Sequence, residues 1–250
     1  FTLADIQKFN FYGVLFDLPA AFLETIFNIN NSSDIYNLRH LLNFFYYFVG
    51  SIFFYKILKK RFNSSVSLFG ILLFLISPRI YGESFYNPKD IVFLSFLSIA
   101  VFFCFEFLEN KKIIILILFS FFSAACIQTR IIGIFLPLSL LIFYFFSLIS
   151  NGKEIYFAPK YALYILLTLF FLYISWPYLW ENPIKNFLYI FTNLSSITPD
   201  IKIFFNGKYV DVNYMPFNYL PTWMVISSPV INSFLFLIGS YFMFSRLFKR

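Results

Sequence analysis

The chain has 250 residues, of which 60% are hydrophobic and only 12% are charged. A water-soluble domain carries about a quarter charged residues because its surface must be solvated, so the composition excludes an ordinary soluble domain and indicates a surface that mostly faces lipid. The net charge of +7 does not indicate a nucleic-acid partner, because the basic residues lie in short clusters between apolar runs.

The first apolar stretch, residues 10–28, is interrupted by Asp17, Pro19 and Glu24. Asp17 and Glu24 are seven positions apart, which places them on the same face of a helix. We therefore expect residues 1–38 to hold an interfacial helix along the outer surface of the membrane, and not a span.

The apolar segments that follow approach the roughly 20 residues that a membrane-crossing helix needs. The predicted spans are about 40–58, 66–80, 90–108, 113–129, 131–150 and 161–179, and a seventh at about 222–245. Pro78 is expected to end the second span, and the fourth and fifth should form a tight hairpin because only Thr129 and Arg130 separate them. The predicted fold class is therefore all-α, a polytopic transmembrane helix bundle with interfacial helices on its outer face.

The charges of the linkers give this bundle a direction. Eleven cations and three acids, a net charge of +8, lie in the linkers near 56–65, 106–112, 151–160 and 245–250. The rest of the chain holds eight cations and nine acids, a net charge of −1. Positively charged linkers stay in the cytoplasm, so the first set predicts the cytoplasmic side.

The opposite, outer side then receives the loops that carry candidate functional groups. They are residues 1–38, the loop from Arg79 to Asp90, the Arg130 tip and the long loop 180–221. Within the last loop, residues 183–196 are predicted to form a second interfacial helix, and Asn206-Gly207-Lys208-Tyr209 is typical of a turn.

The loop between the second and third predicted spans concentrates charge. Arg79, Glu83, Lys89 and Asp90 lie within 12 residues of a chain that otherwise has few charges. Ionisable residues close to the hydrocarbon are costly and mark functional sites. The alternative is structural: Asp90 would cap the following helix and Lys89 would reach into the headgroups.

Two further residues could contact a ligand. Arg130 lies between apolar helices with no acid nearby in the sequence, so it needs a lipid phosphate or a carboxylate from another loop, unless it only anchors the helix at the interface. His40 is the only histidine, which excludes His-based metal clusters. At the start of a predicted span its alternative role is a structural hydrogen bond.

Several short passages, in this order, resemble the C superfamily of membrane glycosyltransferases. They are Arg39-His40-Leu41-Leu42-Asn43, Pro78-Arg79 through Asn87-Pro88-Lys89-Asp90, Thr129-Arg130-Ile131-Ile132-Gly133, and Pro216-Phe217-Asn218-Tyr219 with Pro229. In the last, Phe217 stands where the family usually has Trp. The resemblance is to the branch of protein mannosyltransferases and aminoarabinose transferases, and it covers nearly all of residues 1–250 as a single, partial, transmembrane domain.

This resemblance implies transfer of a sugar from a polyprenyl-phosphate donor to a lipid, glycan or protein acceptor on the outer face. It implies catalytic roles for Glu83, Asp90 and, less directly, Asp17. The substrate-binding residues that it implies are Arg79, Asn87, Lys89, Arg130 and His40. Relatives differ in their metal requirement, so a divalent cation stays open, and the expected location is a bacterial inner membrane with the site facing the periplasm or exterior.

One departure from the family pattern concerns the catalytic base. The family carries an acidic motif in the loop after its first span, and residues 1–38 do not match it. We therefore expect the principal base upstream of Phe1, and a chain that is inactive by itself.

Two other classes remain as alternatives. A transporter or flippase places charges near the middle of the bilayer and uses inverted repeats, and a membrane scaffold needs no cluster of loop charges. Convergence of Glu83, Lys89 and Arg130 around one outward-facing cavity would favour the transferase.

Overall fold

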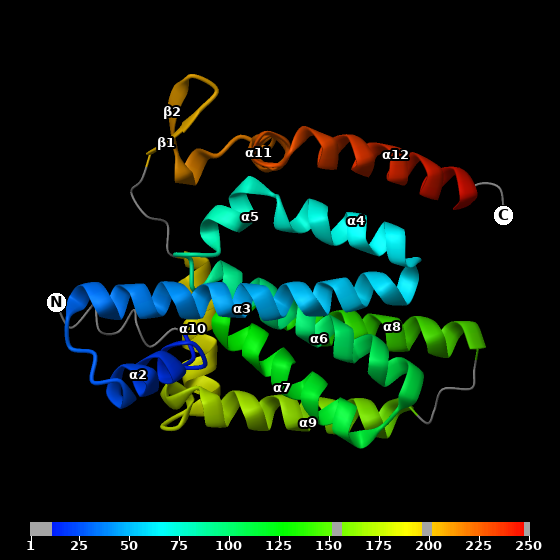
Figure 1. Ribbon diagram of the computed structural model, residues 1–250. Helices are drawn as coiled ribbons and strands as arrows, with labels where there is room; N and C mark the ends of the chain where they lie inside the picture. Colours follow the sequence, from blue (N-terminus) through cyan, green and yellow to red (C-terminus); the bar gives the residue numbers. More distant parts are fainter. Residues whose placement is uncertain (1–11, 152–156, 197–201, 248–250) are drawn as a thin grey trace.

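The computed structural model describes residues 12–151, 157–196 and 202–247, and two long helices form its frame (Figure 1). Helix α3 (Ser32–Arg61) has 30 residues and α6 (Asp90–Asn110) has 21. At about 1.5 Å per residue, both exceed the ~30 Å thickness of the hydrocarbon core. By length and composition these two helices qualify as membrane spans, and a third span is possible if the bent pair α11–α12 counts as one.

Helices α3 and α6 pack closely because small residues face each other. A Cβ atom added at Gly50 of α3 would lie 2.7 Å from the Cα atom of Ser95 in α6. Small side chains are what allow helix backbones to approach in a membrane, where the hydrophobic effect does not drive helices together. The crossing therefore depends on the absence of a side chain at Gly50.

The core continues from α6 through α7 (Ile113–Thr129) to α9 (Phe157–Ser175), each packed against the next. Its centre is apolar and aromatic, and includes Val92, Ala100, Phe119, Ala125 and Tyr164, all of them buried. The rings of Phe119 and Tyr164 are stacked with their centroids 4.4 Å apart. The fourth predicted span, 113–129, coincides with α7.

The remaining parts of the central bundle are shorter. After α7, the 3₁₀ helix η1 (Ile131–Ile134) leads into α8 (Phe135–Asn151), which contacts η1 and α9. The chain does reverse at Arg130, but α7 packs mainly against α6 and α9, so the expected hairpin of two paired helices is wrong.

Two helices lie at the end of the bundle where α3 begins. Helix α2 (Asp17–Ile26) packs beside α3, and α10 (Pro183–Ser196) runs across the direction of the long helices (Figure 1). Between α9 and α10 lies the 3₁₀ helix η3 (Pro177–Leu179). Helices are thus present at both positions where interfacial helices were predicted.

The second predicted span is the first clear difference. Helix α4 (Ser64–Leu75) has 12 residues, about 18 Å, which is too short to cross a membrane alone. Pro78 does not end it, because α4 stops at Leu75 and Pro78 instead begins the six-residue helix α5 (Pro78–Glu83). Proline is favoured at the first helical position because the N–H that it lacks would have no partner there.

The last predicted span is also interrupted. Helices α11 (Tyr219–Ser227) and α12 (Val230–Leu247) are bent by 117° at a short break. Ser228 is extended, with ψ at 145°, because the following Pro229 disfavours a helical residue before it. One continuous helix over 222–245 was therefore the wrong prediction.

Before α11, the chain forms a small hairpin. Strands β1 (Lys202–Phe205) and β2 (Lys208–Asp211) pair antiparallel, and the 3₁₀ helix η4 (Val212–Tyr214) follows. The turn at Asn206 and Gly207 has positive φ angles of 47° and 78°, as a two-residue hairpin turn requires. The predicted turn is confirmed, whereas the strands beside it were not predicted.

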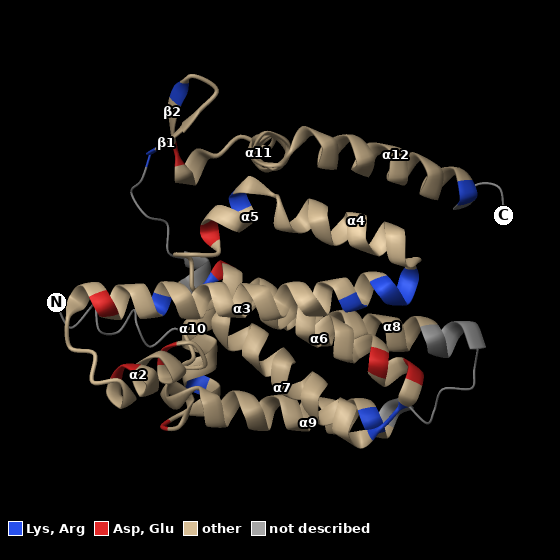
Figure 2. Cartoon of the chain, viewed as in Figure 1, with Lys and Arg blue, Asp and Glu red and all other residues tan. Residues whose placement is uncertain are grey.

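The charged residues gather at the two ends of the helices and leave the middle clear (Figure 2). Cations dominate the end where α3 and α12 finish; there the described charges are Lys56, Lys59, Lys60, Arg61, Lys111, Lys112, Lys160 and Arg246, with Glu106 and Glu109. Lys153, Glu154, Lys249 and Arg250 of the same prediction lie outside the described residues. The fold class is confirmed: the chain is an all-α membrane helix bundle.

Candidate active site at one end of the bundle

The charged loop after α4 forms a chain of hydrogen bonds. Arg79 donates from Nε to Glu83 Oε1 over 3.1 Å, one turn along α5. The amide of Asn87 donates from Nδ2 to Glu83 Oε2 at 3.1 Å and to Asp90 Oδ2 at 2.9 Å. The two carboxylates are thus joined through one asparagine.

Arg130 completes this chain from the far end of α7. Its Nη2 atom lies 2.5 Å from Asp90 Oδ1, an ion pair between α7 and the first residue of α6. We call Arg79, Glu83, Asn87, Asp90 and Arg130 the charge network. Arg130 was expected to bind a lipid phosphate or a carboxylate from another loop, and the carboxylate of Asp90 is its partner in this structure.

The backbone that presents Arg130 depends on a glycine. The Gly133 N–H donates to the Arg130 carbonyl at 2.8 Å, and this closes the turn from α7 into η1. A Cβ atom at Gly133 would lie 2.6 Å from the carbonyl carbon of Cys126, which is backbone and cannot move aside. The Arg-x-x-Gly pattern therefore has a physical basis: glycine lets η1 fold back onto α7.

Asp90 begins α6 but does not cap it with its side chain. The cap is supplied by Asn87, whose Oδ1 accepts from the Asp90 N–H at 3.0 Å. The structural alternative for Asp90, a helix cap, is thus wrong, and its carboxylate faces Arg130 and Asn87 instead.

Each carboxylate oxygen of the charge network has a partner, and the two acids balance the two arginines. The side chains remain reachable, since 22% of Glu83, 51% of Asp90 and 35% of Arg130 is exposed. The Nε atom of Arg130 is buried and has no hydrogen-bond partner. A guanidinium with an unused donor can bind a further anionic oxygen.

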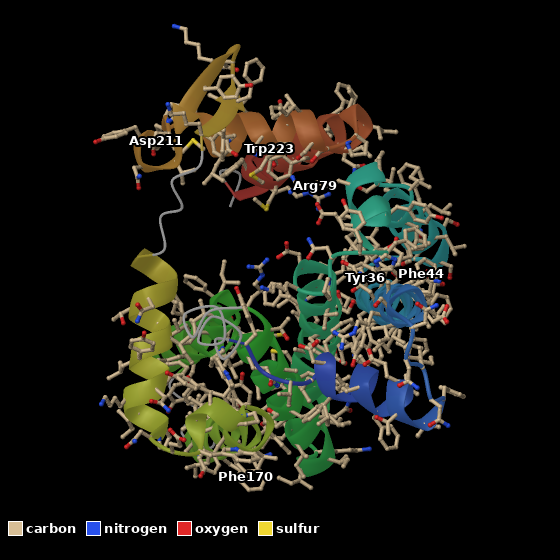
Figure 3. All side chains as sticks on the ribbon, turned by 90° about the vertical axis from the view of Figure 1, so that its left-hand side faces the viewer. Tyr36, Phe44, Arg79, Phe170, Asp211 and Trp223 are labelled. Atoms are coloured by element: carbon tan, nitrogen blue, oxygen red, sulfur yellow. The ribbon has the colours of Figure 1, made fainter. Side chains whose placement is uncertain are left out.

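Aromatic rings cover two of the cations. The Arg79 guanidinium lies 4.9 Å from the ring centroid of Trp223 on α11 (Figure 3), and Lys89 Nζ lies 3.9 Å from that of Tyr12. The contact with Trp223 joins α11 to the charge network. Lys89 makes this aromatic contact beside the network and forms no ion pair with Glu83 or Asp90 in this structure.

Helix α3 contacts the backbone segment that carries Glu83 of the charge network. Asn43 Nδ2 donates to the backbone carbonyls of Glu83 at 3.3 Å and Ser84 at 2.9 Å. The rings of Phe44 and Phe85 are stacked with centroids 5.1 Å apart, which fixes the same segment a second time.

Asp17 and His40 belong to other contacts. Arg39 binds Asp17 Oδ1 at 3.1 Å and Glu24 Oε1 at 2.8 Å. That shared partner confirms that the two acids lie on one face of α2. The His40 ring lies edge-on to Tyr36, with centroids 5.4 Å apart. The structure therefore does not join either residue to the charge network.

Sequence reasoning missed two residues that the structure places at the site. Asn43 was noted only as the end of a motif, although an amide in the apolar stretch from Leu41 to Val49 was itself a signal. Trp223 carried no signal of its own, because nothing in the sequence shows which loop aromatic meets Arg79. Among residues 12–151, 157–196 and 202–247, no three His, Cys, Asp or Glu side chains gather as metal ligands would.

Comparison with known proteins gives one match. A family model described as dolichyl-phosphate-mannose-protein mannosyltransferase matches residues 18–180, more than half of the chain. No curated protein and no solved structure matches. The matched range contains the whole charge network and Asn43, and it ends before the β-hairpin and Trp223.

Proposed function

The chain belongs to the dolichyl-phosphate-mannose-protein mannosyltransferase family, and from that membership we propose that it transfers a sugar from a polyprenyl-phosphate donor to a hydroxyl or lipid acceptor. The family makes the chain a membrane glycosyltransferase. The donor, the acceptor and the outer location of the site are the parts that we propose.

The observation that carries the proposal is the charge network at one end of the bundle. It combines two carboxylates with two guanidinium groups, and Arg130 keeps a buried Nε without a partner. A lipid-linked donor keeps its isoprenoid tail among the helices and its phosphate and sugar at their ends. The charge network therefore lies at the depth in the membrane where the phosphate of such a donor would be.

The reaction needs a base and a group that stabilises the leaving phosphate. A carboxylate takes the proton of the acceptor hydroxyl while the oxygen of that hydroxyl bonds to the anomeric carbon of the sugar. The bond from that carbon to the donor phosphate breaks, and its electron pair leaves with the polyprenyl phosphate. Cationic side chains stabilise this negative charge more strongly as it develops.

The roles follow from the side chains available. We assign the donor phosphate to Arg79, Lys89 and Arg130. Among the described residues we assign proton transfer to Glu83 or Asp90, in addition to the principal base expected upstream of Phe1. In this structure both acids are held by arginines, so a phosphate that draws Arg79 or Arg130 away frees a carboxylate oxygen. Asp17 and His40 are weaker members of the proposal, because their contacts lie outside the charge network.

No observation favours the transporter or flippase alternative. Transporters use ionisable residues within the middle of their spans. In α6 the ionisable acids are Asp90 at the start and Glu106 and Glu109 near the end, and α7 has no charged residue.

The proposal is tested with the intact protein in membranes, supplied with radiolabelled sugars on polyprenyl phosphate. We expect label to move to an acceptor fraction in membranes that contain the protein and not in matched membranes without it. The same sugars offered on nucleoside diphosphates, with endogenous polyprenyl phosphate removed, should give no transfer. Transfer from the nucleotide sugar under those conditions would refute the lipid-linked donor.

A further inference from the structure

The buried amide of Asn43 connects α3 to the charge network. Its side chain is 1% exposed and lies in an apolar part of α3. The amino group has two hydrogens, and the two carbonyls within reach, at 3.3 Å on Glu83 and 2.9 Å on Ser84, can each accept one. Both contacts therefore form at the same time.

These two carbonyls lie at the C-terminal end of α5. The last carbonyls of a helix have no partner within the helix and must be satisfied from elsewhere. The Glu83 carbonyl also accepts from the backbone N–H of Asn87 at 2.9 Å. Asn43 thus holds, from a neighbouring helix, the turn that orients both Glu83 and Asn87.

The oxygen of the same amide indicates that stability alone does not explain the residue. Asn43 Oδ1 is buried and has no hydrogen-bond partner. An unsatisfied buried oxygen destabilises a fold, and an apolar side chain at this position would have no such atom. The amide is better explained by what its amino group holds in place.

We propose that Asn43 is a positioning residue of the glycosyltransferase site: it fixes the turn at Glu83 and Ser84 and so directs the Glu83 carboxylate toward Arg79 and Asn87. The inference rests on the proposed function for its catalytic consequence. The positional part is measurable without any sugar transfer.

The test compares Asn43→Leu and Asn43→Asp with wild type in the intact protein. Leucine removes the donor but keeps the branched shape of the side chain, and aspartate places a second oxygen against the two carbonyls. We expect hydrogen exchange of the amides from Ile80 to Asn87 to rise about tenfold in both variants. We expect kcat to fall about tenfold or more, with the KM for the donor within about twofold, because Lys89 and Arg130 still bind the phosphate.

Ser51→Ala is the matched control. Ser51 is buried on the same helix, but its hydroxyl donates to the Tyr47 carbonyl of α3 itself at 2.8 Å. This variant should leave both the exchange and kcat unchanged. Asn43→Gln keeps an amino donor and should restore part of the lost kcat.

Unchanged exchange at Ile80 to Asn87 in Asn43→Leu would overturn the inference, whatever the activity. If Asn43→Leu does not fold, unchanged exchange in Asn43→Asp overturns the inference in the same way. Equal losses in kcat from Ser51→Ala and Asn43→Leu would also overturn it, because they would indicate a general packing effect. If the wild type transfers no sugar, the proposed function fails while the exchange result still decides the positioning.

Discussion

Asn87 has the most connected position in the charge network. Its amino group donates to both carboxylates, and its oxygen accepts from the backbone of Asp90. An amide is the side chain that can do both, because it carries donors and an acceptor on one plane. The distance between the two acids therefore depends on this residue.

Asn87→Asp should lower transfer about tenfold or more, since a third carboxylate beside Glu83 and Asp90 repels both and removes their shared donor. Rates with a labelled polyprenyl-phosphate donor measure the effect. Asn110→Asp is the control, because Asn110 donates to Glu106 with the same four-residue spacing at the opposite end of α6. Equal losses in the two variants would contradict a specific role for Asn87.

Gly133→Ala should destabilise the fold by about 1–3 kcal/mol, as other overpacked sites do. The added Cβ would meet the backbone of Cys126 and force η1 away from α7. Gly239→Ala in α12 is the control, because an added Cβ has no heavy atom within 4 Å there. Thermal unfolding in detergent compares the two, and an equal or higher midpoint for Gly133→Ala would be evidence against the close approach.

For individual residues, the sequence predicted which side chains belong to the site better than it predicted which side chains they bind. Arg79, Glu83, Asn87 and Asp90 could be grouped because they lie within one loop. Arg130 could be predicted to need an anion, because an isolated guanidinium near lipid is costly. Which carboxylate it binds depends on how α7 meets α6, and no local pattern contains that information.

Helix α2 is attached to the bundle by two ion pairs and by the buried Ala20. Its residues Leu18, Phe22 and Ile26 are exposed, while Asp17 and Glu24 bind Arg39 of α3. An amphipathic helix with an exposed apolar face suits the membrane interface. The two ion pairs then determine where along α3 this helix is held.

Arg39→Leu should therefore release α2 without unfolding the bundle. We expect faster hydrogen exchange over residues 17–26 and little change over residues 90–110. Arg61→Leu is the control, since Arg61 ends the same helix and contacts the Phe105 ring. Unchanged exchange in α2 would mean that its apolar contacts are sufficient.

The elements show why some boundaries were predictable and others were not. The bounds of the helix at residues 113–129 were predicted correctly because lysines and a polar end bound one apolar run. The segments 66–80 and 222–245 are also apolar, but each is interrupted by a break that lies just before a proline, Pro78 or Pro229. Composition measures apolar length, whereas a proline acts on the backbone before it. The strands at 202–211 pair with each other as a local hairpin around a turn that the sequence did indicate.

The whole molecule has two chemically different ends. One is dominated by cations and the other combines acids and bases in the charge network (Figure 2). The all-α bundle follows from composition, because so few charges leave lipid as the main surroundings. Its orientation rests on the distribution of cations between the ends.

We expect the charge network to face outward. Single cysteines at Tyr86, which is exposed beside the network, and at Lys112, on the α6–α7 turn, test this after Cys104 and Cys126 are replaced by alanine. A membrane-impermeant maleimide added to intact cells should label position 86 and not position 112. Labelling of position 112 alone would reverse the orientation.

The central claim is that the charge network transfers a sugar from a lipid-linked donor. The most direct measurement is the transfer rate of Glu83→Gln and Arg130→Ala in the intact protein with labelled polyprenyl-phosphate sugars. We expect each rate to fall about 100-fold, as for loss of a general base or of a group that stabilises the leaving charge. The controls Glu181→Gln and Arg246→Ala, outside the network, should keep the wild-type rate. Wild-type rates in Glu83→Gln and Arg130→Ala would contradict the account.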